Sequence, residues 1–288
     1  MNVAIVTDST AYLPAELVRD GPVPITVVPL HVVMGGKAHR EGVDVTLESL
    51  SEALRAFLPL STSRPSPQEF LDAYEAAAAS GASAVVSVHI SSEMSGTCQS
   101  ARLAAEQAPI PVEVVDSRSL GMAMGFGVLS AAEAAGDGLS VPEVAEIARV
   151  RAVGAKVAFY VDTLEYLRRG GRIGSASALL GSAFAIKPIL TLVDGAIRPL
   201  EKVRTSSRAL ARLTELTAAA ANDVIAAGGK VDIAVQHLDS AGRAEALAAS
   251  LRERVPQAGL VVVAELGAVV GAHVGPGTLA AVASPRPY

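Results

Sequence analysis

The stretch of sequence that decides the fold reads Val3-Ala4-Ile5-Val6-Thr7-Asp8-Ser9-Thr10. Its apolar residues predict a buried strand, and the polar residues after them predict a turn. Pro14 then suits the first turn of a helix, where its missing N–H group is not needed. Strand, loop and helix in this order are typical of a parallel sheet covered by helices.

Further strand-like runs follow, separated by amphipathic helical stretches. They lie at residues 25–31, 84–89, 112–115 and 157–161. This alternation predicts a first α/β domain, residues 1–160, with a mostly parallel sheet.

The pattern changes after about residue 160. Residues 186–192 and 196–203 flank Asp194-Gly195, a pair that supplies the positive φ angles of a tight hairpin turn. Two more predicted strands, 231–237 and 260–265, flank a helix at 240–253, and residues 278–283 could form a last strand. We therefore expect an α/β fold of two α/β domains, the second, residues 161–288, having a mixed sheet.

Composition excludes several classes of function. Half of the 288 residues are hydrophobic but only 3% are aromatic and none is Trp, so platforms that stack on sugars or bases are disfavoured. The formal net charge of −5 argues against a nucleic-acid partner.

Cysteine usage and hydropathy indicate a compartment. Cys98 is the single cysteine, and no Cys and His cluster has zinc-ligand spacing, so we expect neither a disulfide nor a metal site. The first residues do not resemble a signal peptide, and no apolar run reaches the ~18 residues of a membrane span. A cytoplasmic protein is expected, with at most transient contact with a membrane surface.

Three loops are rich in small hydroxyl residues. They are residues 7–10, 61–66 and 91–97. In an open parallel sheet, ligands bind beyond the carboxyl ends of the strands. The third loop enters a helix whose N–H groups favour an anion, and Gly96 would let the backbone approach a ligand closely. Alternatively, the hydroxyls are helix caps, as we expect for the capping boxes Ser66–Glu69 and Ser140–Glu143.

A glycine-rich stretch and a late histidine are further candidates. Arg168-Arg169-Gly170-Gly171-Arg172 lacks the spacing of phosphate-binding and dinucleotide-binding loops, so ATP or NAD binding is weakly supported. The stretch is either a helix end capped at Gly170 or the site of a functional Arg172. His273 precedes a Gly-Pro-Gly turn and is either structural or faces a ligand.

Nucleophilic catalysis is the other chemistry to weigh. Ser95, His273 and either Asp8 or Asp116 could form a hydrolytic triad, but Ser95 lacks the G-x-S-x-G elbow. Cys98 sits just inside a helix start, yet a lone cysteine is more often a small buried hydrophobic residue.

Taken in order, these motifs resemble the DegV family, whose better understood members are the fatty-acid-binding subunits of bacterial fatty acid kinase. The likeness runs nearly the whole length of the chain. The residues that carry it are 3–9, 61–66, 91–97, Val115-Asp116-Ser117, 164–173, 186–190, Lys202-Val203-Arg204 and His273-Val274-Gly275-Pro276-Gly277. Arg64, Cys98 and Gly174 depart from the family pattern, where Gln, Tyr and Ser are common.

The resemblance implies a DegV-like fold that buries one long-chain fatty acid, such as hexadecanoate, between its two domains. Thr62 and Ser95 would hold the carboxylate, with Ser63, Gly96 and His273 beside it. Arg172 would lie near the carboxylate or the surface that meets the kinase.

The same resemblance implies a binding subunit without an enzyme activity or cofactor of its own, serving phospholipid metabolism. ATP and Mg²⁺ would belong to a DhaK-like fatty acid kinase subunit, which would form the acyl phosphate. A lipid-sensing regulatory protein without a kinase, or a small Ser/His acyl hydrolase, remains the alternative.

Overall fold

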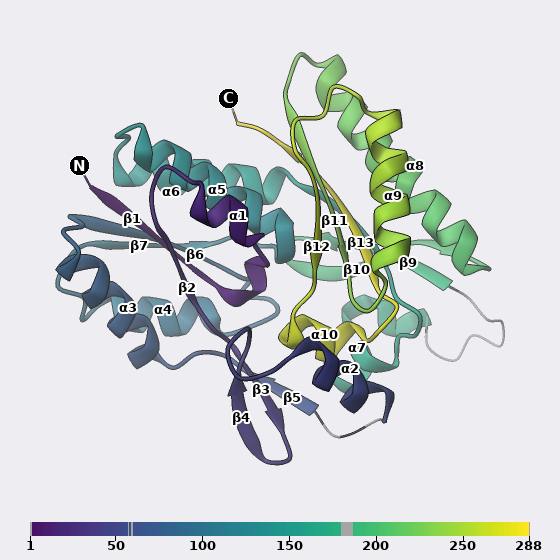
Figure 1. The fold of residues 1–288 in the computed structure, drawn as a ribbon, viewed down its shortest axis with the longest axis horizontal. Coiled ribbons are helices and arrows are strands. Elements are labelled where there is room, and N and C mark those ends of the chain that lie inside the picture. Colours follow the sequence, from purple (N-terminus) through teal and green to yellow (C-terminus); the bar gives the residue numbers. More distant parts are fainter. Residues whose placement is uncertain (1, 57, 59, 180–186, 288) are drawn as a thin grey trace. The chain divides into compact units, whose positions relative to one another are not determined.

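The structure, a computed structural model, describes residues 2–56, 58, 60–179 and 187–287 (Figure 1). The chain divides into two compact units, each made of separate segments. Unit 1 contains residues 2–31 and 63–154, and unit 2 contains residues 32–62 and 155–286. The division into folding domains at residue 160 stays a prediction, whereas residues 32–62 group with the second unit.

Unit 1 is built on a parallel sheet of strand order β2-β1-β6-β7. Its strands are β1 (Val3–Asp8), β2 (Ile25–Val28), β6 (Ala84–His89) and β7 (Val112–Asp116). Its helices are the 3-10 helix η1 (Ser9–Ala11), α1 (Ala15–Arg19), α3 (Pro67–Ala79), α4 (Thr97–Ala105), α5 (Gly121–Gly136) and α6 (Val141–Gly154). The predicted parallel sheet is confirmed.

Helices cover both faces of this sheet because its strands are apolar on both sides. Val3, Ile5 and Val86 pack with residues of α5 and α6. Val6 and Val85 face the other way, toward α3 and α4. Because β1, β6 and β7 pair in parallel, their carboxyl ends lie along one edge of the sheet.

Unit 2 contains a mixed sheet of strand order β10-β9-β8-β13-β11-β12, which confirms the second predicted sheet. Its strands are β8 (Lys156–Tyr160), β9 (Lys187–Val193), β10 (Ala196–Val203), β11 (Val231–His237), β12 (Val261–Glu265) and β13 (Leu279–Pro285). Its helices are α2 (Leu47–Arg55), α7 (Glu165–Arg169), α8 (Ser206–Ala226), α9 (Ala241–Arg254), α10 (Ala268–Val274) and the 3-10 helix η2 (Gly174–Leu179). Residues of α8 and α9 share one apolar cluster with the strands.

The predicted hairpin is present as β9 and β10, which pair antiparallel. Asp194 and Gly195 have φ angles of +52° and +79°, as a two-residue hairpin turn requires. Ile186, the predicted first residue of the hairpin, lies outside the described residues.

The predicted single strand at residues 25–31 was wrong. β2 ends at Val28, and a new strand, β3 (His31–Met34), begins after Pro29, which has no N–H group to continue a ladder. β3 joins β4 (Lys37–Arg40) and β5 (Leu60–Ser63) in a three-stranded sheet of order β4-β3-β5. In the part of the chain that is described, no helix is long and apolar enough to cross a membrane.

Candidate functional site

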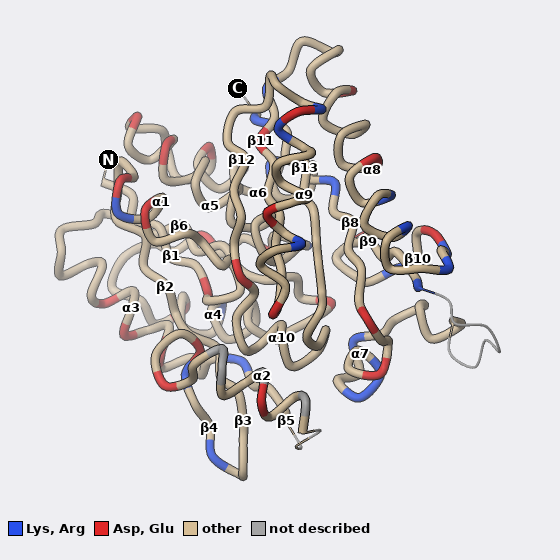
Figure 2. Tube along the Cα trace, turned by 45° about the vertical axis from the view of Figure 1, so that its right-hand side comes forward, with Lys and Arg blue, Asp and Glu red and all other residues tan. Residues whose placement is uncertain are grey.

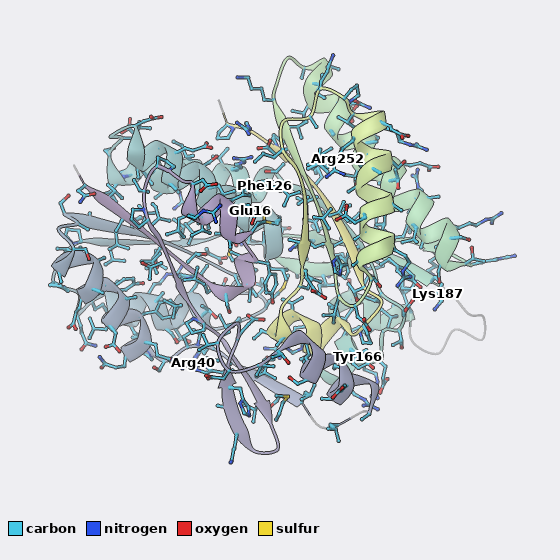
Figure 3. The ribbon with its side chains drawn as sticks, viewed as in Figure 1. Glu16, Arg40, Phe126, Tyr166, Lys187 and Arg252 are labelled. Atoms are coloured by element: carbon cyan, nitrogen blue, oxygen red, sulfur yellow. The ribbon has the colours of Figure 1, made fainter. Side chains whose placement is uncertain are left out.

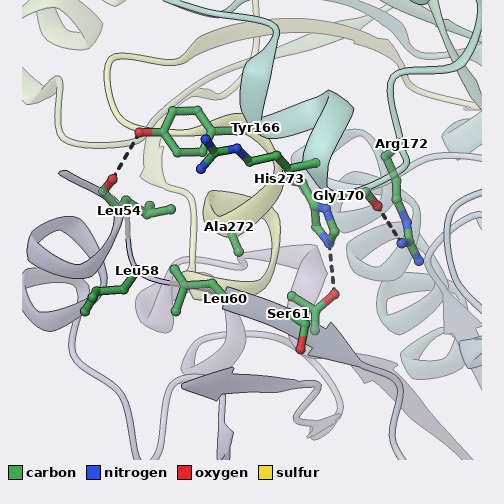
Figure 4. Close-up of a pocket in the computed structure, with 11 residues that line it drawn as sticks. Leu54, Leu58, Leu60, Ser61, Tyr166, Gly170, Arg172, Ala272 and His273 are labelled. Atoms are coloured by element: carbon green, nitrogen blue, oxygen red, sulfur yellow. Dashed lines mark hydrogen bonds between the residues drawn. The ribbon is translucent and has the colours of Figure 1, made fainter. Parts of the chain in front are cut away.

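Unit 2 contains a cavity of about 290 Å³ with an apolar side and a polar side (Figure 4). Leucines from α2 and β5 and the ring of Tyr166 form the apolar side, and hydroxyl, imidazole and guanidinium groups form the polar side. The lining residues are Leu54, Leu58, Leu60, Ser61, Thr62, Tyr166, Arg169, Gly170, Arg172, Ala272 and His273. Such a mixture suits a ligand with one polar end and one apolar end.

The polar side is organised by Thr62 and His273, which are 211 residues apart in sequence. The Thr62 hydroxyl oxygen lies 2.9 Å from Nε2 of His273. Thr62 comes from β5 and His273 from the last turn of α10, so two predicted motifs meet here.

Burial keeps the His273 ring neutral. Desolvation, with a smaller contribution from the positive charge of Arg172, lowers the pKa of His273 to about 4. A neutral ring carries one proton, and Nδ1 is buried without a hydrogen-bond partner in the described structure. A lone pair is cheaper to leave unpaired there than an N–H group. The proton therefore belongs on Nε2, which donates to Thr62 and leaves the Thr62 proton for another acceptor.

The glycine-rich stretch packs directly on His273. A Cβ atom at Gly170 would lie 2.0 Å from Nδ1 of His273, so only glycine allows the ring to rest on the backbone here. Gly170 is also the C-cap of α7, with its N–H bonded to the Tyr166 carbonyl. The predicted helix end at Gly170 is confirmed.

Basic and acidic residues lie close together at α7 (Figure 2). Arg168 and Arg169 both pair with Glu165, at 2.7 and 2.8 Å, and these hydrogen bonds lower the pKa of Glu165 to about 2. Arg172 is exposed and donates to the Gly170 carbonyl at 2.7 Å. That bond is what a helix-end arginine makes, and a function for Arg172 stays a prediction.

Tyr166, a residue of α7 (Figure 3), lines the cavity beside Leu54. Its hydroxyl donates to the Leu54 carbonyl at 3.2 Å, which ties α7 to α2. Sequence reasoning missed Tyr166, Leu54 and Leu60. The DegV-like block 164–173 contained Tyr166, but nothing in its spacing indicated which of its side chains line a cavity.

Ser95, Ser63 and Gly96 belong to unit 1. The Ser95 hydroxyl is half-buried and 2.8 Å from that of Thr97, and Ser63 is exposed at the end of β5. A Cβ at Gly96 would lie 2.0 Å from the Arg64 guanidinium, so Arg64 fills the space beside this glycine. The binding roles of these residues stay predictions.

Helix capping accounts for some of the hydroxyls but not for the two central ones. Ser66 and Glu69 form the complete capping box of α3, and Ser140 donates to Glu143 at 2.5 Å before α6. Thr62 lies in a strand, and Ser95 precedes Gly96, the N-cap of α4.

The components of the alternative triad are engaged elsewhere. Asp8 accepts from His89, at 3.1 Å, and from the Ile90 N–H, while Asp116 accepts from Ser92. The Cys98 thiol is buried, and desolvation raises its pKa to about 12, which suits a hydrophobic residue better than a nucleophile. Within the described residues, no group of His, Cys, Asp or Glu could hold a metal ion.

The chain therefore combines two α/β units, one of which contains a cavity lined by leucines and by the Thr62–His273 pair. A family model described as "Uncharacterised protein, DegV family" matches residues 2–286. The chain belongs to the DegV family.

Relatives and solved structures agree with this assignment. A DegV domain-containing protein of Streptomyces coelicolor is 53% identical, with 99% of each chain covered. The fatty-acid-binding DegV family protein of Thermus thermophilus has a TM-score of 0.90 and 34% identity over 99% of this chain and 100% of its own. DegV of Bacillus subtilis, a fatty acid binding protein, has a TM-score of 0.89 and 33% identity, with 99% and 100% covered.

Proposed function

We propose that this chain binds one long-chain fatty acid, with its carboxylate held by Thr62 and Ser95. The observation that carries the proposal is the Thr62–His273 pair at the polar side of a leucine-lined cavity. The fatty-acid-binding relatives of Thermus thermophilus and Bacillus subtilis support it.

Hydrogen-bond direction explains why Thr62 suits a carboxylate. A carboxylate only accepts, so its partner must have a proton to spare. Because Nε2 of His273 donates to the Thr62 oxygen, the proton of the Thr62 hydroxyl is left to donate to the carboxylate. A Ser95 hydroxyl would supply a second donor, and Ser63, Gly96 and His273 would surround the head group.

Affinity would come mainly from the tail. About fourteen methylenes at ~0.8 kcal/mol each contribute on the order of 11 kcal/mol of transfer free energy before association costs. The cavity in unit 2, of about 290 Å³, is at the small end of the range for ligand pockets.

We further propose that the bound carboxylate is presented to a partner kinase. Neutral hydroxyl donors leave a carboxylate oxygen able to attack a phosphoryl group, whereas a bidentate arginine would engage both oxygens. ATP and Mg²⁺ would be supplied by a DhaK-like fatty acid kinase subunit, and Arg172 would serve the complex.

Native mass spectrometry of the purified protein, followed by extraction and identification of any ligand, tests the binding proposal. One fatty acid per chain is expected. An empty protein that hydrolyses acyl esters would instead favour the Ser/His hydrolase. A bound fatty acid without an ATP-binding partner in a pull-down would favour the lipid-sensing regulator.

A further inference from the structure

A chain of fully buried polar groups crosses unit 1 beneath its hydroxyl-rich loops. Asp8, Ser87, His89 and Tyr74 are all inaccessible to solvent. Tyr74 Oη lies 2.9 Å from Ser87 Oγ, and Ser87 Oγ lies 2.7 Å from Nε2 of His89. Nδ1 of His89 lies 3.1 Å from Oδ2 of Asp8. A buried network of this kind is costly unless every member is satisfied.

The direction of each bond follows from the inventory of donors. Asp8 meets four donors: Oδ1 accepts from the N–H and the hydroxyl of Thr10 at 3.0 and 2.5 Å, and Oδ2 accepts from the Ile90 N–H at 2.9 Å and from His89. Both carboxylate oxygens of Asp8 are therefore satisfied as acceptors. The Ser87 hydroxyl joins Nε2 of His89 to the Tyr74 hydroxyl.

This arrangement resembles a Ser-His-Asp triad but cannot act as one. The serine oxygen is enclosed and hydrogen-bonded to Tyr74, and no substrate could reach it. Two of the hydrogen bonds to Asp8 instead come from backbone N–H groups, those of Thr10 and Ile90. Thr10 lies in η1, directly after β1, and Ile90 begins the loop after β6 that leads to Ser95.

A second carboxylate holds the same loop from the neighbouring strand. Asp116, at the end of β7, accepts from the Ser92 hydroxyl and from the Arg118 N–H at 2.9 Å. The Ser92 N–H also points to Asp116, at 3.3 Å. The loop from Ile90 to Ser95 is therefore fixed at its first and third residues by two carboxylates on the sheet edge.

We infer that Asp8 and Asp116 are positioning residues that hold the Ile90–Ser95 loop in the conformation that presents the Ser95 hydroxyl to an anionic head group. This inference rests on the proposed fatty-acid function. Preorganisation lowers the cost of binding, because an ordered loop loses little entropy when the ligand arrives. Neither aspartate needs to touch the ligand.

The test uses two nearly isosteric substitutions and a matched control. Asp8→Asn and Asp116→Asn each replace an acceptor oxygen with an NH₂ group that cannot accept. Tyr74→Phe removes a hydroxyl from the other end of the buried network, where its hydrogen bond is to Ser87 in β6. Each full-length variant is titrated with palmitate, and amide hydrogen exchange is followed across residues 90–97.

Both aspartate variants should bind palmitate roughly tenfold more weakly or worse and exchange faster across the loop. Tyr74→Phe should keep the affinity and the loop protection of the wild type, even with a lower melting temperature. Unchanged affinity and exchange in both aspartate variants would overturn the inference, as would an equal loss in Tyr74→Phe. If Asp8→Asn does not fold, the palmitate affinity and loop exchange of Asp116→Asn alone decide whether the inference holds. Failure of the wild type to bind palmitate would sink the proposed function instead, and exchange alone would then test the positioning role.

Discussion

At the scale of single residues, the candidate site depends on which hydroxyl has a proton to give. Thr62 has its oxygen satisfied by His273, and Ser95 has Thr97 as its neighbour. Neither caps a helix, so removing either hydroxyl should not unravel an element.

Thr62→Ala and Ser95→Ala should therefore separate binding from stability. A hydrogen bond to a charged group contributes roughly 1.5 to 3 kcal/mol, so each substitution should weaken fatty-acid binding by about one to two decades. Fatty-acid titrations beside thermal melts measure both quantities. Ser66→Ala is the control, because it removes a helix cap and should lower stability by about 1 kcal/mol without changing affinity. Unchanged affinity in both site variants would end the assignment.

His273 should make the protein less stable in mild acid. Its pKa is lowered to about 4 in the folded protein from an ordinary value of 6.5, so the unfolded chain takes up the proton first. The contribution of the neutral His273 to the free energy of unfolding is fully present above about pH 6.5. It falls as the pH drops and is lost below about pH 4. The loss should be about 3 kcal/mol.

Thermal melts between pH 4 and 7.5 check this for the wild type and for His273→Gln. The variant has no titrating group at position 273, so its melting temperature should fall less steeply with acid. Parallel curves would contradict a buried, neutral His273.

At the scale of elements, the sequence predicted those strands, turns and caps that depend on residues close together in the chain. The apolar runs of β1 and β6, the Asp194-Gly195 turn and the Ser66 capping box each depend on near neighbours in the chain, and all were confirmed. The four-residue strands β3 to β5 were not predicted. The pair Gly35-Gly36 is a turn signal between β3 and β4, and in the structure the two glycines have φ angles of +56° and +77°.

The candidate site was less predictable, since its contacts join distant segments. Thr62, Gly170 and His273 were each singled out in the sequence, but their meeting depends on how β5, α7 and α10 pack in unit 2. The Asp8–His89 pair was missed for the same reason: 81 residues separate its members.

A substitution at the end of α10 tests how closely this helix packs on α7. Gly275, its C-cap, has φ +77° and ψ +167°, and a Cβ there would lie 2.2 Å from the Tyr166 ring. Gly138, after α5, has φ +80° but open space around it. Gly138→Ala should cost about 1 to 2 kcal/mol for the backbone conformation alone. Gly275→Ala should cost clearly more in urea unfolding, because the ring must also move, and equal losses would contradict the packing of α10 on α7.

At the scale of the whole molecule, the proposed division of labour places lipid binding in this chain and phosphoryl transfer in a partner. Half of the residues are hydrophobic, yet in the described part no helix could span a membrane. The apolar residues instead fill the cores of the two units and one side of the cavity. A bound acyl chain would extend that apolar interior, while its carboxylate stayed among hydroxyl groups.

Arg172 provides the prediction that separates lipid binding from delivery. It is exposed, follows two glycines and lines the polar side of the cavity, where an acyl phosphate would need positive charge. Arg172→Ala should keep its fold and its fatty acid but lose acyl-phosphate formation when kinase and ATP are added. Arg168→Ala is the matched control, since Arg168 pairs with Glu165 on the same element and is not among the cavity-lining residues. Lipid retention, melting temperature and kinase-dependent ATP consumption are measured on both variants. If Arg172 only stabilises the Gly170 carbonyl, its loss costs about 0.3 to 1 kcal/mol of stability and ATP consumption stays normal, which would exclude the functional role.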